Sequence, residues 1–124
     1  MRPRRFAKAR PRRVPGTMNG LELAYSKLLD TRKAAGEIEH WVFESVTLKL
    51  ADDTRYTPDF CVVNKDMEIE FHETKGFMRD DANVKMKVAA KIFEMFHFVL
   101  ITRKSKKDGG GWDIRRVGNT KEGA

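Results

Sequence analysis

The spacing of apolar residues changes several times along the chain, and each change predicts an element. From Leu21 to Leu29 the apolar positions recur every three to four residues, which is the period of an amphipathic helix. Asn19 is a good N-cap and Gly36 a typical stop, so we predict a helix over about residues 20–35.

A period of two follows this helix. Residues 41–50 are rich in β-branched and aromatic residues, and further strands are predicted over about residues 55–63 and 68–75, with short polar turns at residues 52–53 and 64–66 between them. We expect three strands joined by these turns as an antiparallel meander.

The helical period returns over about residues 80–96. We expect the apolar stripe of this helix to face the core; it comprises Val84, Val88, Ile92 and Met95, widened by Ala89 and Phe96. The almost wholly apolar run from His97 to Thr102 predicts a strand buried on both faces, and residues 112–117 predict an edge strand. The order αβββαββ, with a helix between the third and fourth strands, indicates an α/β fold with a mixed sheet flanked by helices.

Length and composition fit one domain. The chain has 124 residues, of which 40% are hydrophobic, and no apolar run is long enough to span a membrane. The basic N-terminus is not followed by an apolar stretch, so it does not resemble a secretory signal. The single cysteine, Cys61, is typical of a reducing compartment, and we expect a cytoplasmic protein.

The net charge of +7 comes entirely from the first 16 residues, because the remaining 108 residues carry 18 basic and 18 acidic side chains. Such an arm, rich in arginine and proline, is expected to be disordered and to suit a polyanion, DNA or RNA, although it could simply aid solubility. We therefore divide the chain into a basic arm (1–16), a folded domain (17–118) and a frayed tail (119–124). The cations of the arm are Arg2, Arg4, Arg5, Lys8, Arg10, Arg12 and Arg13.

Three side chains in the strands stand out as candidates for chemistry. Asp59 follows Pro58 inside the second predicted strand, where a lone carboxylate among apolar residues would be costly. On the third strand one face begins with apolar residues and ends with Glu73 and Lys75, which is typical of a site rather than a solvent-facing surface. The simpler alternatives are a paired structural acid at Asp59 and a plain ion pair between Glu73 and Lys75.

The turn at residues 64–66 would place Asp59 opposite a residue near Phe71, with Glu73 diagonal to it. The two carboxylates could then share a hard divalent cation such as Mg²⁺. Lys75 would lie beside this cation, where it could orient or deprotonate an attacking water.

Pro58-Asp59 followed by Glu73-Thr74-Lys75 on consecutive strands resembles the PD…(D/E)xK motif of the restriction-endonuclease-like nuclease superfamily. The order of elements from Asn19 to Thr102 is similar to the αβββαβ core of that superfamily, especially to small phage-encoded members and junction-resolving enzymes. The resemblance implies a magnesium-dependent DNA endonuclease in which Mn²⁺ can substitute, acting in the host cytoplasm if phage-encoded. A homodimer would suit cleavage of junctions or duplexes.

The resemblance also implies roles for single residues. Asp59 and Glu73 would be metal ligands, with the backbone carbonyl of Thr74 completing the inner shell, and Lys75 would position water or act as the general base. Glu22, in the first predicted helix, would assist through a second metal ion or a water; its simpler interpretation is a first-turn acid favoured by the helix dipole.

Other polar residues give weaker signals. Lys85, Lys87 and Lys91 on the second predicted helix could contact phosphate or could form a solvated face. His72 lies on the strand face opposite the motif, and no cysteine–histidine spacing indicates zinc.

Two functions compete with the nuclease hypothesis. The first is a non-catalytic nucleic-acid-binding protein on the same fold, which the complete set of motif residues argues against. The second is a basic RNA-binding protein, which is disfavoured because the folded part is charge-neutral and shows no aromatic pair for base stacking.

Overall fold

The computed structural model describes residues 16–76 and 80–118. The expected basic arm lies outside the described residues except for Gly16, and so does the expected tail at residues 119–124.

The first helix forms where the sequence predicts it. Helix α1 spans Gly20–Ala34 and is capped by Asn19, whose side-chain oxygen accepts a hydrogen bond from the backbone N–H of Glu22 at 2.8 Å. Glu22 returns the bond, because its Oε1 accepts the N–H of Asn19 at 2.9 Å. This reciprocal capping box satisfies two of the donors that every helix N-terminus leaves unpaired.

A mixed five-stranded sheet has the order β1-β4-β5-β6-β7. The pairs β1–β4, β4–β5 and β6–β7 are antiparallel, whereas β5 and β6 run parallel and are linked by helix α2. The expected crossover and the mixed sheet are therefore confirmed, as is the edge strand β7. The strands of this sheet are β1 (Ile38–Phe43), β4 (Phe60–Asn64), β5 (Ile69–Lys75), β6 (His97–Arg103) and β7 (Trp112–Val117), and α2 spans Asp80–Ile92.

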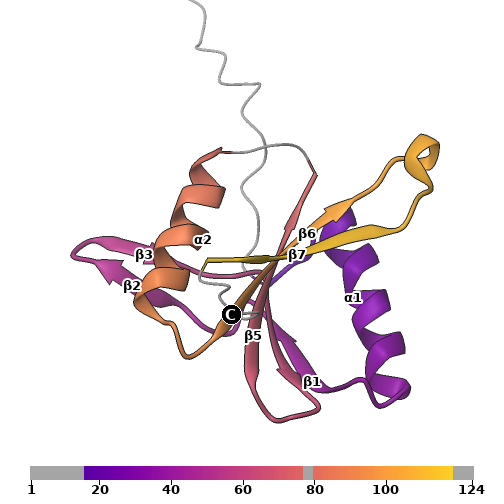
Figure 1. Ribbon diagram of the computed structural model, residues 1–124, viewed down its shortest axis with the longest axis horizontal. Helices are drawn as coiled ribbons and strands as arrows, with labels where there is room; N and C mark the ends of the chain where they lie inside the picture. The colour runs from indigo at the N-terminus through magenta and orange to yellow at the C-terminus, as the bar shows by residue number, and fades with distance from the viewer. Residues whose placement is uncertain (1–15, 77–79, 119–124) are drawn as a thin grey trace, which may run out of the picture.

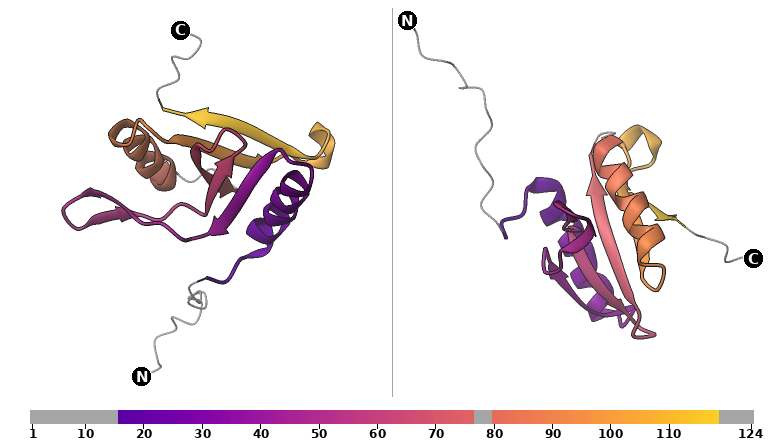
Figure 2. Two further views of the ribbon diagram at one scale, coloured as in Figure 1. Left: turned by 90° about the horizontal axis from the view of Figure 1, so that it is seen from below. Right: turned by 90° about the vertical axis from the view of Figure 1, so that its left-hand side faces the viewer.

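The two helices lie on opposite faces of the sheet, as Figures 1 and 2 show. Because strand residues alternate between faces, each face has its own core. Tyr25 and Leu29 of α1 pack on Phe60, Val62 and their neighbours. On the other face, Phe71, Phe98 and Leu100 pack with Met86, Ala89 and Ala90 of α2.

A separate two-stranded hairpin, β2 (Leu48–Ala51) and β3 (Thr54–Tyr56), extends beside α2 and is not hydrogen-bonded into the main sheet (Figure 2). Its residues Leu48 and Tyr56 join the core on the α2 face. The prediction of single strands over residues 41–50 and 55–63 is therefore wrong. Each of these runs contributes to two strands, with breaks at residues 44–47 and 57–59.

The prediction for α2 is wrong in two respects. The helix ends at Ile92, so the expected extension to Phe96 does not form. The expected core stripe is also mostly on the outside, since Val84 is 56% exposed and Met95 68% exposed, and Val88 and Ile92 are exposed as well. Met86 and Ala90 make the buried face together with Ala89, the member of the expected stripe that is buried, because small residues let the helix approach the sheet and hairpin closely.

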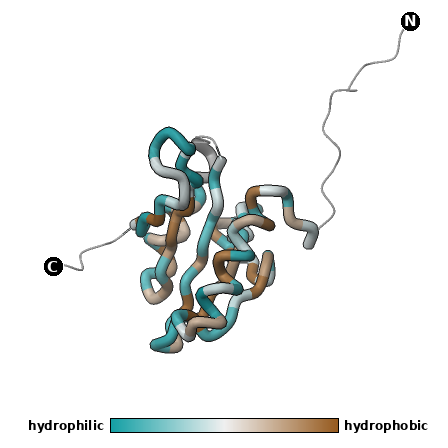
Figure 3. Tube along the Cα trace, turned by 90° about the vertical axis from the view of Figure 1, so that its right-hand side faces the viewer, coloured by the Kyte–Doolittle hydropathy of each residue, from teal (hydrophilic) through white to brown (hydrophobic). Residues whose placement is uncertain are grey.

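Hydrophobic positions lie mainly inside the body and hydrophilic ones at its turns, as the coloured trace in Figure 3 shows. Within the described residues, neither helix is long and apolar enough to cross a membrane.

Candidate metal centre

Three carboxylates from three different elements meet at one end of the sheet. Glu22 of α1, Glu44 just after β1 and Asp59 just before β4 each place a carboxylate oxygen within 4.8 Å of the others. Glu22 is 3% exposed and Asp59 is 7% exposed, so this acidic triad is largely removed from water. Oxygen ligands at this spacing can hold a metal ion.

Asp59 is held in place by its neighbour across the ladder. Its Oδ2 accepts the backbone N–H of Thr74 at 2.9 Å and the hydroxyl of Thr74 at 2.8 Å. Asp59 does not lie inside a strand as predicted; it lies in a bend at the start of β4. The register pairs Phe60 with His72, so continuing it by one residue puts Asp59 opposite Glu73 rather than diagonal to it.

Glu73 reaches the same region from β5. Its Oε1 accepts the hydroxyl of Tyr56 at 2.8 Å and the backbone N–H of Asp59 at 3.2 Å. Lys75, two residues further along β5, is 7% exposed and ends the strand. The structure therefore brings together four of the predicted site residues, Glu22, Asp59, Glu73 and Lys75, at one end of the sheet.

Glu44 is the member of the triad that the sequence reasoning missed. Its φ of 45° lies in the left-handed region that non-glycine residues rarely adopt, and this turn ends β1. Its backbone N–H donates to the carbonyl of Asp59 at 2.8 Å, and its Oε1 accepts the N–H of Gly16 at 3.3 Å. The available signal was that Glu44 is the lone acid among residues 41–51, in a run otherwise typical of a strand.

Burial and mutual repulsion disfavour the ionised forms of these acids. Burial raises the pKa of Asp59 above its ordinary value; hydrogen bonds from Thr74 oppose this, and the charge of Glu22 adds to it. Burial also raises the pKa of Glu73, and the nearby charge of Asp59 raises it further. A bound divalent cation would relieve both the cost of burial and the mutual repulsion, because its charge, instead of a bound proton, would neutralise the carboxylates.

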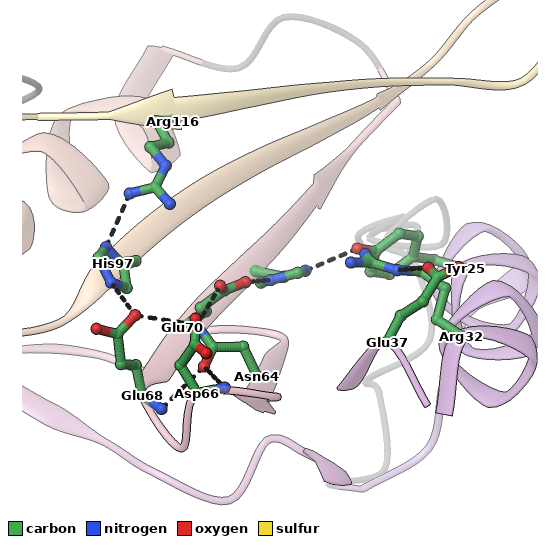
Figure 4. A network of polar contacts seen from close by, with 10 residues as sticks. Tyr25, Arg32, Glu37, Asn64, Asp66, Glu68, Glu70, His97 and Arg116 are labelled. Atoms are coloured by element: carbon green, nitrogen blue, oxygen red, sulfur yellow. Dashed lines mark hydrogen bonds and ion pairs between the residues drawn. The ribbon is translucent and has the colours of Figure 1, made fainter. Parts of the chain in front are cut away.

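A second polar network occupies the α1 face of the sheet (Figure 4). The hydroxyl of Tyr25 lies 2.7 Å from Nδ1 of His72, whose Nε2 lies 2.9 Å from Oε1 of Glu70. Burial lowers the pKa of His72, so the neutral ring donates to Glu70 and accepts from Tyr25. Both ring nitrogens are thus engaged away from the acidic triad, which agrees with a structural role for His72.

The same network continues to the start of β5. The side-chain amide of Asn64 donates to Glu70 at 2.9 Å and to Glu68 at 3.2 Å. Although burial opposes it, the hydrogen bonds from His72 and Asn64 lower the pKa of Glu70 to about 2. Glu70 is partly buried in this network, whereas Glu68 is exposed and also contacts His97, which in turn contacts Arg116.

The predicted phosphate-binding lysines of α2 differ in their surroundings. Lys85 donates from Nζ to the backbone carbonyl of Arg55 at 3.0 Å and so ties α2 to the β2–β3 hairpin. Lys87 and Lys91 are exposed and line a surface hollow together with Glu94 and Gly118. None of the interactions described for these three lysines joins them to the acidic triad.

Comparison with known protein families, curated proteins and solved structures finds no match to this chain. The assignment of a function therefore depends on the geometry and chemistry of the residues described above.

Proposed function

We propose that the chain is a metal-dependent nuclease that hydrolyses phosphodiester bonds in DNA. The observation that carries the proposal is the convergence of the carboxylates of Glu22, Glu44 and Asp59, two of them buried and Glu44 partly buried, at the strand end that bears Glu73 and Lys75. Buried acids at this density are costly unless a cation neutralises them, so their presence in one place needs a reason beyond stability.

The donor set fits a hard divalent ion. The three ligands that the triad offers are all carboxylate oxygens, the type that Mg²⁺ and Mn²⁺ prefer, and no histidine or cysteine of the described residues belongs to the triad. Asp59 and Glu73 remain the ligands implied by the motif, together with the carbonyl of Thr74. The geometry adds Glu44 and supports Glu22 as a ligand that also caps α1.

The metal ion, Lys75 and Thr74 would each have a separate role in catalysis. A bound Mg²⁺ would supply electrostatic stabilisation of the charge that develops on the phosphate oxygens. Nζ of Lys75, a residue buried at the end of β5, would orient the attacking water or accept its proton. Thr74 would hold Asp59 in register through its two hydrogen bonds.

The arrangement of elements supports the same proposal. A capped helix, an antiparallel strand pair carrying the motif, a crossover helix and a parallel strand follow one another, in the order expected for a restriction-endonuclease-like core. DNA as the substrate is supported by the cationic arm of the sequence, which would release counterions from phosphates. Dimerisation remains an expectation from the resemblance.

A cleavage assay with end-labelled DNA tests the proposal. Full-length protein is incubated with duplex, single-stranded, flapped and four-way-junction DNA, with Mg²⁺, with Mn²⁺ or with a chelator. We expect cleavage of at least one substrate that requires the metal, and a loss of about 100- to 10,000-fold in the Lys75→Ala variant, the usual range for removal of a general base.

Lys65→Ala is the matched control, because Lys65 lies in the exposed turn between β4 and β5. It should cut at the wild-type rate. DNA binding without metal-dependent cleavage of any substrate would refute the nuclease and favour the non-catalytic binding protein. Equal cleavage by wild type and Lys75→Ala would refute the role of Lys75.

A further inference from the structure

Tyr56 links the β2–β3 hairpin to the candidate metal centre. It ends β3, is 6% exposed, and packs its ring into the core on the α2 face. The hairpin belongs to a separate sheet, so this side chain reaches the centre from outside the five-stranded sheet that carries Glu73.

The hydroxyl of Tyr56 has a specific partner. It donates to Oε1 of Glu73 at 2.8 Å, and the same oxygen accepts the backbone N–H of Asp59 at 3.2 Å. Two donors on one carboxylate oxygen restrict the rotation of the Glu73 side chain, which would otherwise populate several rotamers. A phenylalanine would fill the same apolar space without the desolvation cost of a hydroxyl, so the contact with Glu73 is what distinguishes tyrosine here.

We propose that Tyr56 is a positioning residue that holds the Glu73 carboxylate in the orientation required for metal binding. This inference rests on the proposed function, because it assigns a role to Glu73 as a metal ligand. Tyr56 acts through Glu73 and does not itself touch the substrate. The consequence is that the hairpin sets the metal affinity of a site located in the main sheet.

The chain offers a matched control in its other tyrosine. Tyr25 is fully buried, and its hydroxyl also makes a buried hydrogen bond, to His72 on the opposite face of the sheet. Tyr25→Phe and Tyr56→Phe therefore remove the same atom from similarly buried rings. Only the second removal affects a carboxylate of the candidate centre.

The test measures Mn²⁺ binding to the full-length proteins by electron paramagnetic resonance, together with the Mn²⁺ concentration that gives half-maximal cleavage. We expect Tyr56→Phe to bind Mn²⁺ about 10- to 100-fold more weakly than wild type, the effect usual for partners that orient metal ligands. Cleavage at saturating Mn²⁺ should recover most of the wild-type rate. Tyr25→Phe should bind Mn²⁺ with wild-type affinity, whatever its stability.

Each result decides one part. Unchanged Mn²⁺ affinity in Tyr56→Phe, or equally weakened affinity in Tyr56→Phe and Tyr25→Phe, would overturn the positioning role of Tyr56. The metal centre itself would still be supported if wild type binds Mn²⁺ and Asp59→Asn does not. If wild type binds no Mn²⁺, both the centre and the role of Tyr56 are wrong. If wild type binds Mn²⁺ but cuts no DNA, the nuclease is refuted and the comparison of affinities still decides the role of Tyr56.

Discussion

Replacing Asp59 with asparagine removes one negative charge from the acidic triad and keeps a hydrogen-bond acceptor in the same place. The Oδ2 atom of Asp59 accepts two bonds from Thr74, and the amide oxygen of asparagine can accept both. The variant therefore separates the electrostatic cost of the triad from the loss of a contact.

The expected magnitude follows from the raised pKa. Burial, with the charge of Glu22, raises the pKa of Asp59, so the folded state holds a proton that the unfolded state releases. This bound proton stabilises the folded state in full at pH values below about 3.9, the pKa of an aspartate in the unfolded chain. The stabilisation is lost as the pH rises through the higher pKa of Asp59 in the folded protein. The pKa is raised from 3.8 to about 7 and one pKa unit corresponds to about 1.4 kcal/mol, so metal-free Asp59→Asn should be more stable than wild type at pH 8 by up to about 4 kcal/mol.

The assay is urea unfolding of both proteins at pH 4.0 and pH 8.0, with a chelator and then with excess Mg²⁺. At pH 4.0 the two free energies of unfolding should be close, because Asp59 is then protonated in the folded state. Excess Mg²⁺ at pH 8.0 should stabilise wild type by about 2.7 kcal/mol at 100 times its dissociation constant, and should stabilise the variant far less.

Asp66→Asn provides the control, because Asp66 lies in the exposed turn before β5 and this variant keeps the acidic triad, so excess Mg²⁺ should stabilise it as much as it stabilises wild type. The reasoning fails if Asp59→Asn is less stable than wild type in chelator at pH 8.0. It fails equally if Mg²⁺ stabilises the variant as much as it stabilises wild type.

Three further predictions test the fold around the site. Val88→Glu should change the free energy of unfolding by less than about 0.5 kcal/mol, whereas Met86→Ala should cost about 2–5 kcal/mol, because only Met86 is buried; equal losses in urea unfolding would contradict the observed face of α2. Gly118→Ala should cost about 1–3 kcal/mol, since φ is +95° and a Cβ would lie 2.5 Å from that of Ala90; an unchanged melting temperature would contradict this packing. Burial lowers the pKa of His72, so below pH 6.5 the unfolded state binds the extra proton and wild type should lose stability relative to His72→Gln by up to about 1.4 kcal/mol per pH unit, whereas above pH 7.5 the difference between the two proteins should no longer change with pH.

The parts of the fold that the sequence predicts well are those in which local signals agree. Asn19, Glu22 and Gly36 mark the two ends of α1, and the spacing of apolar residues between them matches one buried face. The crossover between β5 and β6 is similarly well specified, because an apolar run follows a helix and must return to the sheet. In these segments propensity, capping and burial all favour the same structure.

The prediction fails where the local signal of a break between strands is weak. Residues 41–50 alternate well enough to be one strand, yet the left-handed turn at Glu44 separates β1 from β2. The face of α2 is mostly wrong for a different reason: an alanine such as Ala90 carries little hydrophobic weight in a sequence pattern, but its small size permits the close contact with the sheet and hairpin. Both failures depend on tertiary packing, which overrides local preference.

The unpredicted turn and the predicted motif meet at the same place, and this coincidence bears on why the turn exists. A left-handed non-glycine residue costs about 1–3 kcal/mol, and glycine at position 44 would avoid that strain. A glycine would also remove the carboxylate that completes the acidic triad with Glu22 and Asp59. The chain thus accepts backbone strain and electrostatic repulsion together at one end of the sheet. Neither stabilises the fold, and a cation bound as proposed above would offset both by neutralising the three acids.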